Sequence, residues 1–184
     1  MRDLSLHILD LAQNSVRANA ALVEIMVSVD ESRLITITIR DDGSGMSDEL
    51  KERVTSPFAT TRTTRKVGLG IPLMMQNARL AGGDVRIDST LGQGTTLTVT
   101  LHGDSIDCLP LGDLAGTVVS LVSANPERPD FRLSCSSPKG SMDFDTREMR
   151  QALGNVPLNE PEITAWMLSA IQEEIEPIFG GVIL

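Results

Sequence analysis

The fold of this chain is decided by the stretch DDGSGM at residues 41–46. The stretch directly follows a run in which Ile35, Ile37 and Ile39 alternate with threonines, a pattern that predicts a strand with one buried face. Its two glycines let the backbone turn and approach a flat ring closely, and its first aspartate can accept a hydrogen bond from an exocyclic amine. Taken alone, the stretch is equally compatible with a glycine-rich surface turn.

The residues before this stretch predict a helix followed by the first strand of a hairpin. Apolar residues at helical spacing after Asp3 predict a helix over residues 3–18, and alternating apolar residues over 21–29 predict a strand. Asp10 and Asn14 lie four residues apart and therefore share one face of the helix. An amide oxygen can ligate Mg²⁺, and a carboxylate one turn earlier can orient or deprotonate water. A solvated helix face is the alternative for this pair alone.

The residues after DDGSGM predict a second helix and a second pair of strands. A short helix over 47–53 and a loop rich in Thr and Arg over 55–67 lead to the stretch GLG at residues 68–70, which opens a helix running to about Ala81. The unpaired N–H groups at a helix start favour a phosphate, although glycine turns into helices are common. Two alternating strands follow, joined by the turn LGQG at residues 91–94. This order predicts helices covering one face of a mainly antiparallel sheet.

Five motifs in this order resemble those of the GHKL superfamily, the ATP-binding fold shared by gyrase, Hsp90-type chaperones, histidine kinases and DNA mismatch-repair ATPases. The resemblance covers about residues 4–102. It implies a Bergerat-type α/β sandwich, in which helices lie on one face of a mixed, mainly antiparallel sheet. The motifs are the N-box helix DLAQNS at 10–15, the first glycine box DDGSGM at 41–46, the lid entry SPFATT at 56–61, the second glycine box GLGI at 68–71 and the closing turn GQGT at 92–95.

The resemblance implies roles for individual residues in binding Mg²⁺-ATP. Asp41 would bind the adenine amino group with the support of Thr95, and Met46 would line the adenine pocket. Asn14 would hold Mg²⁺ against the phosphates. The other implied nucleotide-binding residues are Gly43, Gly45, Thr60, Arg62, Lys66, Gly68, Leu69 and Gly70. The basic side chains among these, together with Arg65, would neutralise phosphate charge in the lid; a solvated basic loop is the alternative for them.

Two departures from the histidine-kinase pattern bear on activity. Lys66 stands where histidine kinases of this fold usually carry a glycine, so the lid is expected to differ in shape. Asp10 stands where typical histidine kinases carry asparagine, and where the gyrase and mismatch-repair branches carry a glutamate that serves as general base. Aspartate is one methylene shorter than glutamate, yet the resemblance implies Asp10 as the catalytic base.

A third departure is the position of the N-box helix, which begins within the first residues of the sequence. Histidine kinases phosphorylate a histidine on a helical module that precedes the ATP-binding domain, and no such module fits before residue 4. His7 and His102 are the two histidines, and His7 is expected to be a packing or surface residue. We therefore expect no autophosphorylation on histidine.

Composition excludes several classes of function for this chain of 184 residues. Its 16 Lys+Arg and 25 Asp+Glu give a formal net charge of −9, and 3% of its residues are aromatic, which together argue against direct recognition of nucleic acid. No apolar run approaches the ~20 residues that cross a bilayer, so no membrane partner is expected. Cys108 and Cys135 are not spaced as a metal-binding pair, which favours a reduced, cytoplasmic setting.

The acidity is concentrated in the C-terminal part of the chain. Residues 1–102 carry 11 basic and 12 acidic side chains, whereas residues 103–184 carry 5 and 13. The change in charge and in motif content predicts two domains. An ATP-binding domain would span residues 1–103, and a small acidic α/β domain would span residues 104–184.

The predicted C-terminal domain carries helical and alternating patterns but shows no family resemblance. Its last helix is predicted to start at Asn159, with Glu162 completing a capping box. Its acidity is either a solvated surface or a docking face for a basic partner. A protein partner would therefore contact either the lid or this domain.

Together these patterns predict a cytoplasmic histidine-kinase-like protein that binds ATP and Mg²⁺ and lacks its own phosphoacceptor histidine. It would be an ATPase or a protein kinase in signalling, hydrolysing ATP or phosphorylating a separate partner. The alternative is an ATP-dependent binding switch, similar to the anti-sigma factors of this superfamily, with little or no catalysis. The sequence leaves the partner and the oligomeric state open.

Overall fold

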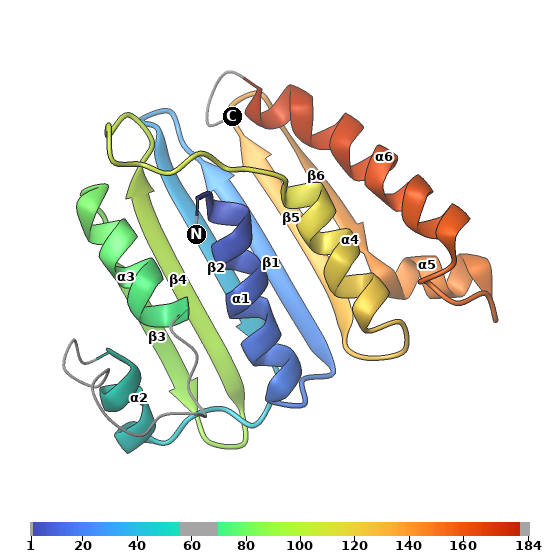
Figure 1. The fold of residues 1–184 in the computed structure, drawn as a ribbon, viewed down its shortest axis with the longest axis horizontal. Coiled ribbons are helices and arrows are strands. Elements are labelled where there is room, and N and C mark those ends of the chain that lie inside the picture. The colour runs from blue at the N-terminus through green and yellow to red at the C-terminus, as the bar shows by residue number, and fades with distance from the viewer. Residues whose placement is uncertain (1, 56–69, 181–184) are drawn as a thin grey trace.

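A six-stranded sheet forms the centre of the computed structural model, which describes residues 2–55 and 70–180 (Figure 1). The strand order is β3-β4-β2-β1-β5-β6, and neighbouring strands are antiparallel except β1 and β5, which are parallel. The strands are β1 (Leu22–Val29), β2 (Leu34–Asp41), β3 (Val85–Thr90), β4 (Gly94–His102), β5 (Asp130–Ser137) and β6 (Gly140–Asp145).

Helices cover one face of this sheet, as the sequence predicts. Figure 1 shows α1, α3, α4 and α6 lying in front of the strands. The helices are α1 (Leu4–Arg17), α2 (Asp48–Thr55), α3 (Gly70–Leu80), α4 (Leu114–Ala124), α5 (Thr146–Leu153) and α6 (Pro161–Phe179). This helical layer and the mixed sheet confirm the two-layer α/β sandwich.

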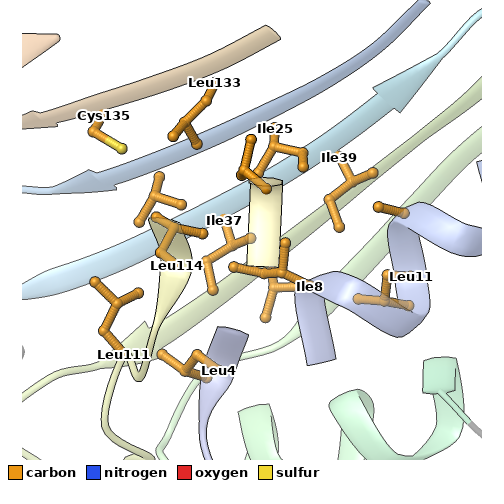
Figure 2. Packing of buried hydrophobic residues seen from close by; sticks show 14 of the residues in the cluster. Leu4, Ile8, Leu11, Ile25, Ile37, Ile39, Leu111, Leu114, Leu133 and Cys135 are labelled. Atoms are coloured by element: carbon orange, nitrogen blue, oxygen red, sulfur yellow. The ribbon is translucent and has the colours of Figure 1, made fainter. Parts of the chain in front are cut away.

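The core lies between the sheet and the helical layer, because every second residue of a strand faces the helices. β1 and β2 accordingly alternate between buried and less buried positions. Figure 2 shows Ile8 of α1 packed beside Ile37 of β2 and close to Ile25 of β1, and none of these three side chains is more than 1% exposed. Burying one such side chain contributes about 1.5–3 kcal/mol to folding.

The pairing register brings three motifs together at one end of the sheet. Asp41, the last residue of β2, lies opposite Val23 of β1 and Thr95 of β4. The first glycine box follows Asp41 and the turn at 92–95 leads into β4, so both lie at this end. The N-box helix α1 also ends there, since the chain passes directly from α1 into β1.

Residues 104–184 continue the same sheet and the same core. Ile25 of β1 lies opposite Leu133 of the parallel strand β5. Figure 2 shows Leu133 beside Ile25, with Leu114 of α4 nearby, and these side chains belong to one cluster of buried residues. The predicted domain boundary after residue 103 therefore lies within a shared sheet. Whether either side folds alone stays a prediction.

The start of α2 agrees with the sequence, and the start of α6 does not. Ser47 caps α2, since its Oγ accepts a backbone N–H of the first turn at 3.3 Å. α6 begins at Pro161, and its N-cap residue Glu160 makes no side-chain capping bond. The predicted capping box of Asn159 and Glu162 is therefore wrong. A proline suits the first helical position and disfavours helical backbone in the residue before it, which places the start two residues later.

Candidate functional site

A cavity of about 240 Å³ lies at the end of the sheet where the motifs meet. Its apolar walls come from α1, α2, α3 and the adjacent strands β2 and β4: Leu11, Ile39, Leu50, Val54, Ile71 and Leu97. Five of the residues predicted to bind nucleotide also line it: Asn14, Asp41, Gly45, Met46 and Thr95. The fold therefore gathers residues from separate motifs around one space that is mostly apolar and has a few polar groups, as is typical of a small-molecule site.

Asp41 is the most strongly fixed polar group of the cavity. Its side chain is 8% exposed. One carboxylate oxygen, Oδ2, accepts the Ser15 hydroxyl at 2.6 Å, and the other, Oδ1, accepts the Gly43 N–H at 2.9 Å. A carboxylate oxygen has room for two hydrogen bonds, so each oxygen of Asp41 retains one acceptor position. The geometry suits recognition of a ligand N–H by a pre-oriented carboxylate.

Ser89 joins the first glycine box to the closing turn. Its Oγ accepts the Met46 N–H at 2.8 Å, donates to the Gly94 carbonyl at 2.9 Å and lies 2.9 Å from Oγ1 of Thr95. Because the single Ser89 proton goes to Gly94, the Thr95 hydroxyl donates to Ser89 and keeps its lone pairs as acceptors. Ser89 therefore fixes both the position and the polarity of Thr95.

The first glycine box needs glycine because the chain passes very close to its neighbours. Gly45 has a φ of +65°, and a Cβ there would lie 2.1 Å from the Thr90 carbonyl oxygen. The box is held between two elements, since the Ser44 N–H donates to the Ala18 carbonyl at 2.9 Å and the Ser44 carbonyl accepts the Gly92 N–H at 2.7 Å. The box is thereby fixed against both the end of α1 and the closing turn.

Asp10 and Gly70 meet beside the cavity. A Cβ on Gly70 would lie 2.0 Å from Oδ2 of Asp10, so α3 begins directly against this carboxylate. Ile71 and Asn14, the neighbours of this contact along their helices, both line the cavity. The N-terminus of α3 carries a partial positive charge from the helix dipole. The contact thus places a carboxylate and a positive helix end side by side.

Asn14 offers one neutral oxygen to a cation. Its Oδ1 accepts a hydrogen bond from Nη1 of Arg17 at 3.2 Å, which takes one of the two acceptor positions of this oxygen and leaves the other for a cation. Within residues 2–55 and 70–180, no cluster of three or more His, Cys, Asp or Glu is arranged to hold a metal. A single amide oxygen fits Mg²⁺ that keeps several waters and takes its remaining ligands from phosphates.

The structure leaves part of the predicted site untested. The predicted residues Thr60, Arg62, Lys66, Gly68 and Leu69, and Arg65 beside them, lie outside the described residues. Of the other predicted residues, those named above surround the cavity or lie beside it. Gly43 lies behind Asp41, against Ala18 of the α1 end.

Three residues of the site were not predicted from the sequence. Ser15 follows Asn14 in the N-box helix, and a pairing of its hydroxyl with Asp41 requires knowledge of how α1 crosses β2. Ser89 continues the alternation of Val85 and Ile87, and this spacing places it on the covered face of the sheet. Arg17 lines the cavity from the last turn of α1, and no motif in the sequence distinguishes it from a solvated arginine.

A comparison with protein families identifies a match over residues 2–105, to the model of the histidine kinase-, DNA gyrase B- and HSP90-like ATPases. Among curated proteins, the sensor histidine kinase WalK of Bacillus subtilis is 30% identical over 100 residues, which are 50% of this chain and 16% of that protein. The histidine protein kinase DivJ of Caulobacter vibrioides is 31% identical over 105 residues, 54% of this chain and 18% of that protein. The chain thus spans less than a fifth of these relatives.

Among solved structures, the N-terminal domain of a DNA repair protein is similar to this chain with a TM-score of 0.52 and 17% sequence identity. The match covers 79% of this chain and 52% of that one. At this identity the similarity concerns the fold alone. Because it covers more of the chain than residues 2–105, the shared fold includes part of the C-terminal region. Among the described helices, none has the length and apolar composition needed to cross a membrane.

Proposed function

Because the chain belongs to the family of histidine kinase-, DNA gyrase B- and HSP90-like ATPases, we propose that it binds Mg²⁺-ATP in the cavity between α1, the first glycine box and β4. We further propose that it uses the ATP catalytically, by hydrolysis or by phosphorylating a separate partner in signalling. The buried Asp41, held by Ser15 and Gly43 in a mostly apolar cavity, is the observation that supports this proposal most directly.

The adenine end of the proposed complex rests on Asp41 and Thr95. The free acceptor position of the carboxylate would take an N–H of the adenine amino group, and Thr95 would support it from β4. Met46 and Leu97 would contact the faces of the base. A charge-assisted hydrogen bond of this kind contributes about 1.5–3 kcal/mol, so Asp41 is expected to contribute a large part of the affinity.

The phosphate end would lie toward Asn14, Asp10 and Gly70. Asn14 would supply one oxygen to Mg²⁺, which, when bound, would neutralise charge on the phosphates. The N–H groups at the start of α3 would donate to phosphate oxygens. Asp10 would accept a proton from a water or from a hydroxyl of the partner, as a general base. The lid residues Thr60, Arg62, Lys66, Gly68 and Leu69 belong to the proposed site from the sequence alone.

A phosphate acceptor on a separate partner agrees with the positions of the two histidines. His7 is 1% exposed and lies between α1 and α3. His102 is at the far end of β4, seven residues beyond Thr95, a distance of about 23 Å at ~3.3 Å per residue. Neither imidazole therefore faces the cavity. The lid and the acidic C-terminal region remain the proposed contacts for a protein partner.

Two variants test the binding and the catalytic parts of this proposal. Asp41→Asn replaces the acceptor oxygen by an amide, and we expect Mg²⁺-ATP affinity in calorimetry to fall by at least about tenfold. Asp10→Asn should abolish phosphate release while nucleotide binding survives. Asp107→Asn, an exposed carboxylate in the loop after β4, is the matched control and should change neither measurement.

The outcomes distinguish the alternatives. Unchanged ATP affinity in Asp41→Asn would refute the adenine site. Equal phosphate release from the wild type and Asp10→Asn would remove Asp10 from the mechanism. Tight ATP binding without any phosphate release or transfer would favour the binding switch, in which case a partner should be retained with Mg²⁺-ATP and lost without nucleotide.

A further inference from the structure

A buried histidine joins α1 to α3 next to the candidate site. His7 is 1% exposed, and its Nε2 lies 2.7 Å from Nδ2 of Asn77 on α3. Its other ring nitrogen, Nδ1, is buried and has no hydrogen-bond partner among the described residues. Leaving a buried polar atom unsatisfied is unfavourable, and an apolar side chain of similar size would avoid it. Packing alone therefore does not explain a histidine at this position.

The His7 contact is the first of two contacts between α1 and α3 that bear on the candidate site. His7 lies one turn before Asp10 on α1, and Asn77 lies two turns after Gly70 on the same face of α3. The second point is the contact between Asp10 and Gly70, where a Cβ would lie 2.0 Å from the carboxylate. A change in the spacing of the helices at His7 would therefore move Asp10 relative to the start of α3.

The His7 contact favours the neutral imidazole. If the Asn77 amide donates to Nε2, the ring carries its proton on Nδ1; if the amide is turned, Nε2 donates and Nδ1 is bare. A charged ring would place an N–H and a positive charge at Nδ1 with no acceptor. Burial lowers the pKa of His7 from 6.5, and the positive amino terminus lowers it further, whereas Asp10 and Asp3 raise it.

We propose that His7, held by Asn77, positions Asp10 against the start of α3, and that nucleotide binds the arrangement of α1 and α3 in which His7 is neutral. His7 is a positioning residue, because it would act through Asp10 and touch neither nucleotide nor metal. This inference rests on the proposed function, since it requires phosphates beside Asp10 and Gly70. By linkage, nucleotide binding lowers the pKa of His7, and acidification weakens nucleotide binding by the same free energy.

The imidazole can be observed directly, because the chain has two histidines. In a His102→Gln variant, the remaining imidazole signals in NMR report His7 alone, and His102 is exposed at the end of β4. We expect the pKa of His7 to fall by about half a unit or more when Mg²⁺ and a non-hydrolysable ATP analogue are added, which corresponds to about threefold weaker binding at low pH. An identical pKa with and without bound nucleotide would overturn the inference.

Two further variants separate positioning from general destabilisation. His7→Leu removes the titrating group, so the ratio of its affinity to that of the wild type should rise between pH 7.5 and pH 5.5, toward a limit of about threefold at pH values below the pKa of His7. The comparison is made at each pH because the nucleotide's own phosphate also gains a proton in this range. Asn77→Asp places a carboxylate beside Nε2, which should raise the pKa of His7 and move the loss of affinity to higher pH.

The results also separate this inference from the proposed function. A merely structural role for His7 would lower affinity by the same factor at both pH values, and that result would overturn the positioning role while leaving nucleotide binding established. If the wild type at pH 7.5 does not bind Mg²⁺-ATP at all, the proposed function and this inference both fail.

Discussion

The strands β1 to β4 and the strands β5 and β6 belong to parts of the sheet that use their polar side chains in different ways. In the half built from β1 to β4, polar groups from distant parts of the chain converge on a cavity, as Ser15, Asp41 and Thr95 do. In the half built from β5, β6 and their helices, polar groups mainly hold the chain together. Arg150 of α5, for example, donates to Asp130 of β5 at 2.8 Å and also to a backbone carbonyl.

The charge of the C-terminal half follows from this difference. Each of its basic side chains bonds to an acceptor within the fold, namely Arg128, Arg132, Lys139, Arg147 and Arg150. α6 carries four glutamates and no Lys or Arg, and three of them lie in its last two turns, where the helix dipole disfavours negative charge. The four glutamates of α6 are all exposed, so this helix presents part of the acidity at the surface, while the basic residues stabilise the fold.

Shortening the chain is the most direct test of whether β1 to β4 fold without β5 and β6. Deleting residues 106–184 removes the strand that pairs with β1 and uncovers core side chains such as Ile25. We expect the remaining residues 1–105 to lose cooperative thermal unfolding, because large buried apolar surface and a full row of strand hydrogen bonds are exposed together. Circular dichroism and calorimetry of the shortened chain test this.

The same experiment decides the domain boundary. If residues 1–105 unfold cooperatively and bind Mg²⁺-ATP, the predicted division after residue 103 describes two folding units. The two halves would then be joined by the sheet without depending on each other. Aggregation with no thermal transition would instead show that β5 completes the nucleotide-binding fold.

A smaller loss of stability is expected when Arg150, which joins α5 to β5, is replaced. Arg150→Ala leaves the Asp130 carboxylate with the hydroxyl of Thr146 at 2.9 Å, and the half-buried guanidinium contacts are lost. We expect about 1–2 kcal/mol lower unfolding free energy, a fall of about 2–4 °C in thermal midpoint per kcal/mol, with nucleotide affinity unchanged. Arg86→Ala, which breaks an exposed pair with Asp88, is the control and should not move the midpoint.

Residues that lie close together in the sequence made much of the fold, and part of the cavity lining, predictable. The alternation of Ile35, Ile37 and Ile39 predicted β2, and the stretch that follows predicted Asp41 at the end of the strand. Ser15 escaped prediction because its role depends on which strand α1 crosses. Ser15 and Asp41, which a hydrogen bond joins, are 26 residues apart in the sequence. Ser89 escaped it because its bonds to Met46 and Thr95 depend on how β3 pairs with β4.

The C-terminal region was predictable as elements but not as part of the same sheet. The patterns around Phe131 and Met142 indicate strands, yet a pattern does not say which strand is the neighbour. Parallel pairing of β5 with β1 joins residues more than a hundred positions apart, and no turn or motif in the sequence signals it. Pro161 is also evident in the sequence, and it sets the start of α6 in place of the predicted capping box at Asn159. The proline ring disfavours helical backbone in the residue before it, whatever side chain could cap the helix.

Ser15→Ala tests the cavity half of the comparison with a smaller change. The buried bond from the Ser15 hydroxyl to Oδ2 of Asp41 is lost, so the carboxylate is less firmly oriented. We expect Mg²⁺-ATP affinity in calorimetry to fall about fivefold, equivalent to roughly 1 kcal/mol. Ser28→Ala, a serine of β1 that points away from the helices, is the control. Equal affinities for both variants would show that Gly43 alone orients Asp41.

The smallest expected effect is on the rate at which Cys135 is alkylated. This rate measures how tightly the two halves of the sheet are coupled. Burial raises the pKa of the Cys135 thiol to about 12, so at pH 8 this thiol stays protonated and does not react in the folded chain. Alkylation of Cys135 therefore reports opening of β5. In a Cys108→Ser variant, which removes the second thiol, labelling of the folded protein should be slow and should reach one group per chain only on unfolding.

Measuring the rate of Cys135 labelling with and without nucleotide tests whether β5 is coupled to the cavity. Because β5 pairs directly with β1, and β1 follows the N-box helix, a ligand that stabilises the cavity should also stabilise β5 against opening. Saturating Mg²⁺-ATP should slow Cys135 labelling by the same factor by which it slows global unfolding. If labelling is fast, or does not change when nucleotide binds, β5 opens independently of the cavity, and the C-terminal half is a separate unit despite the shared sheet.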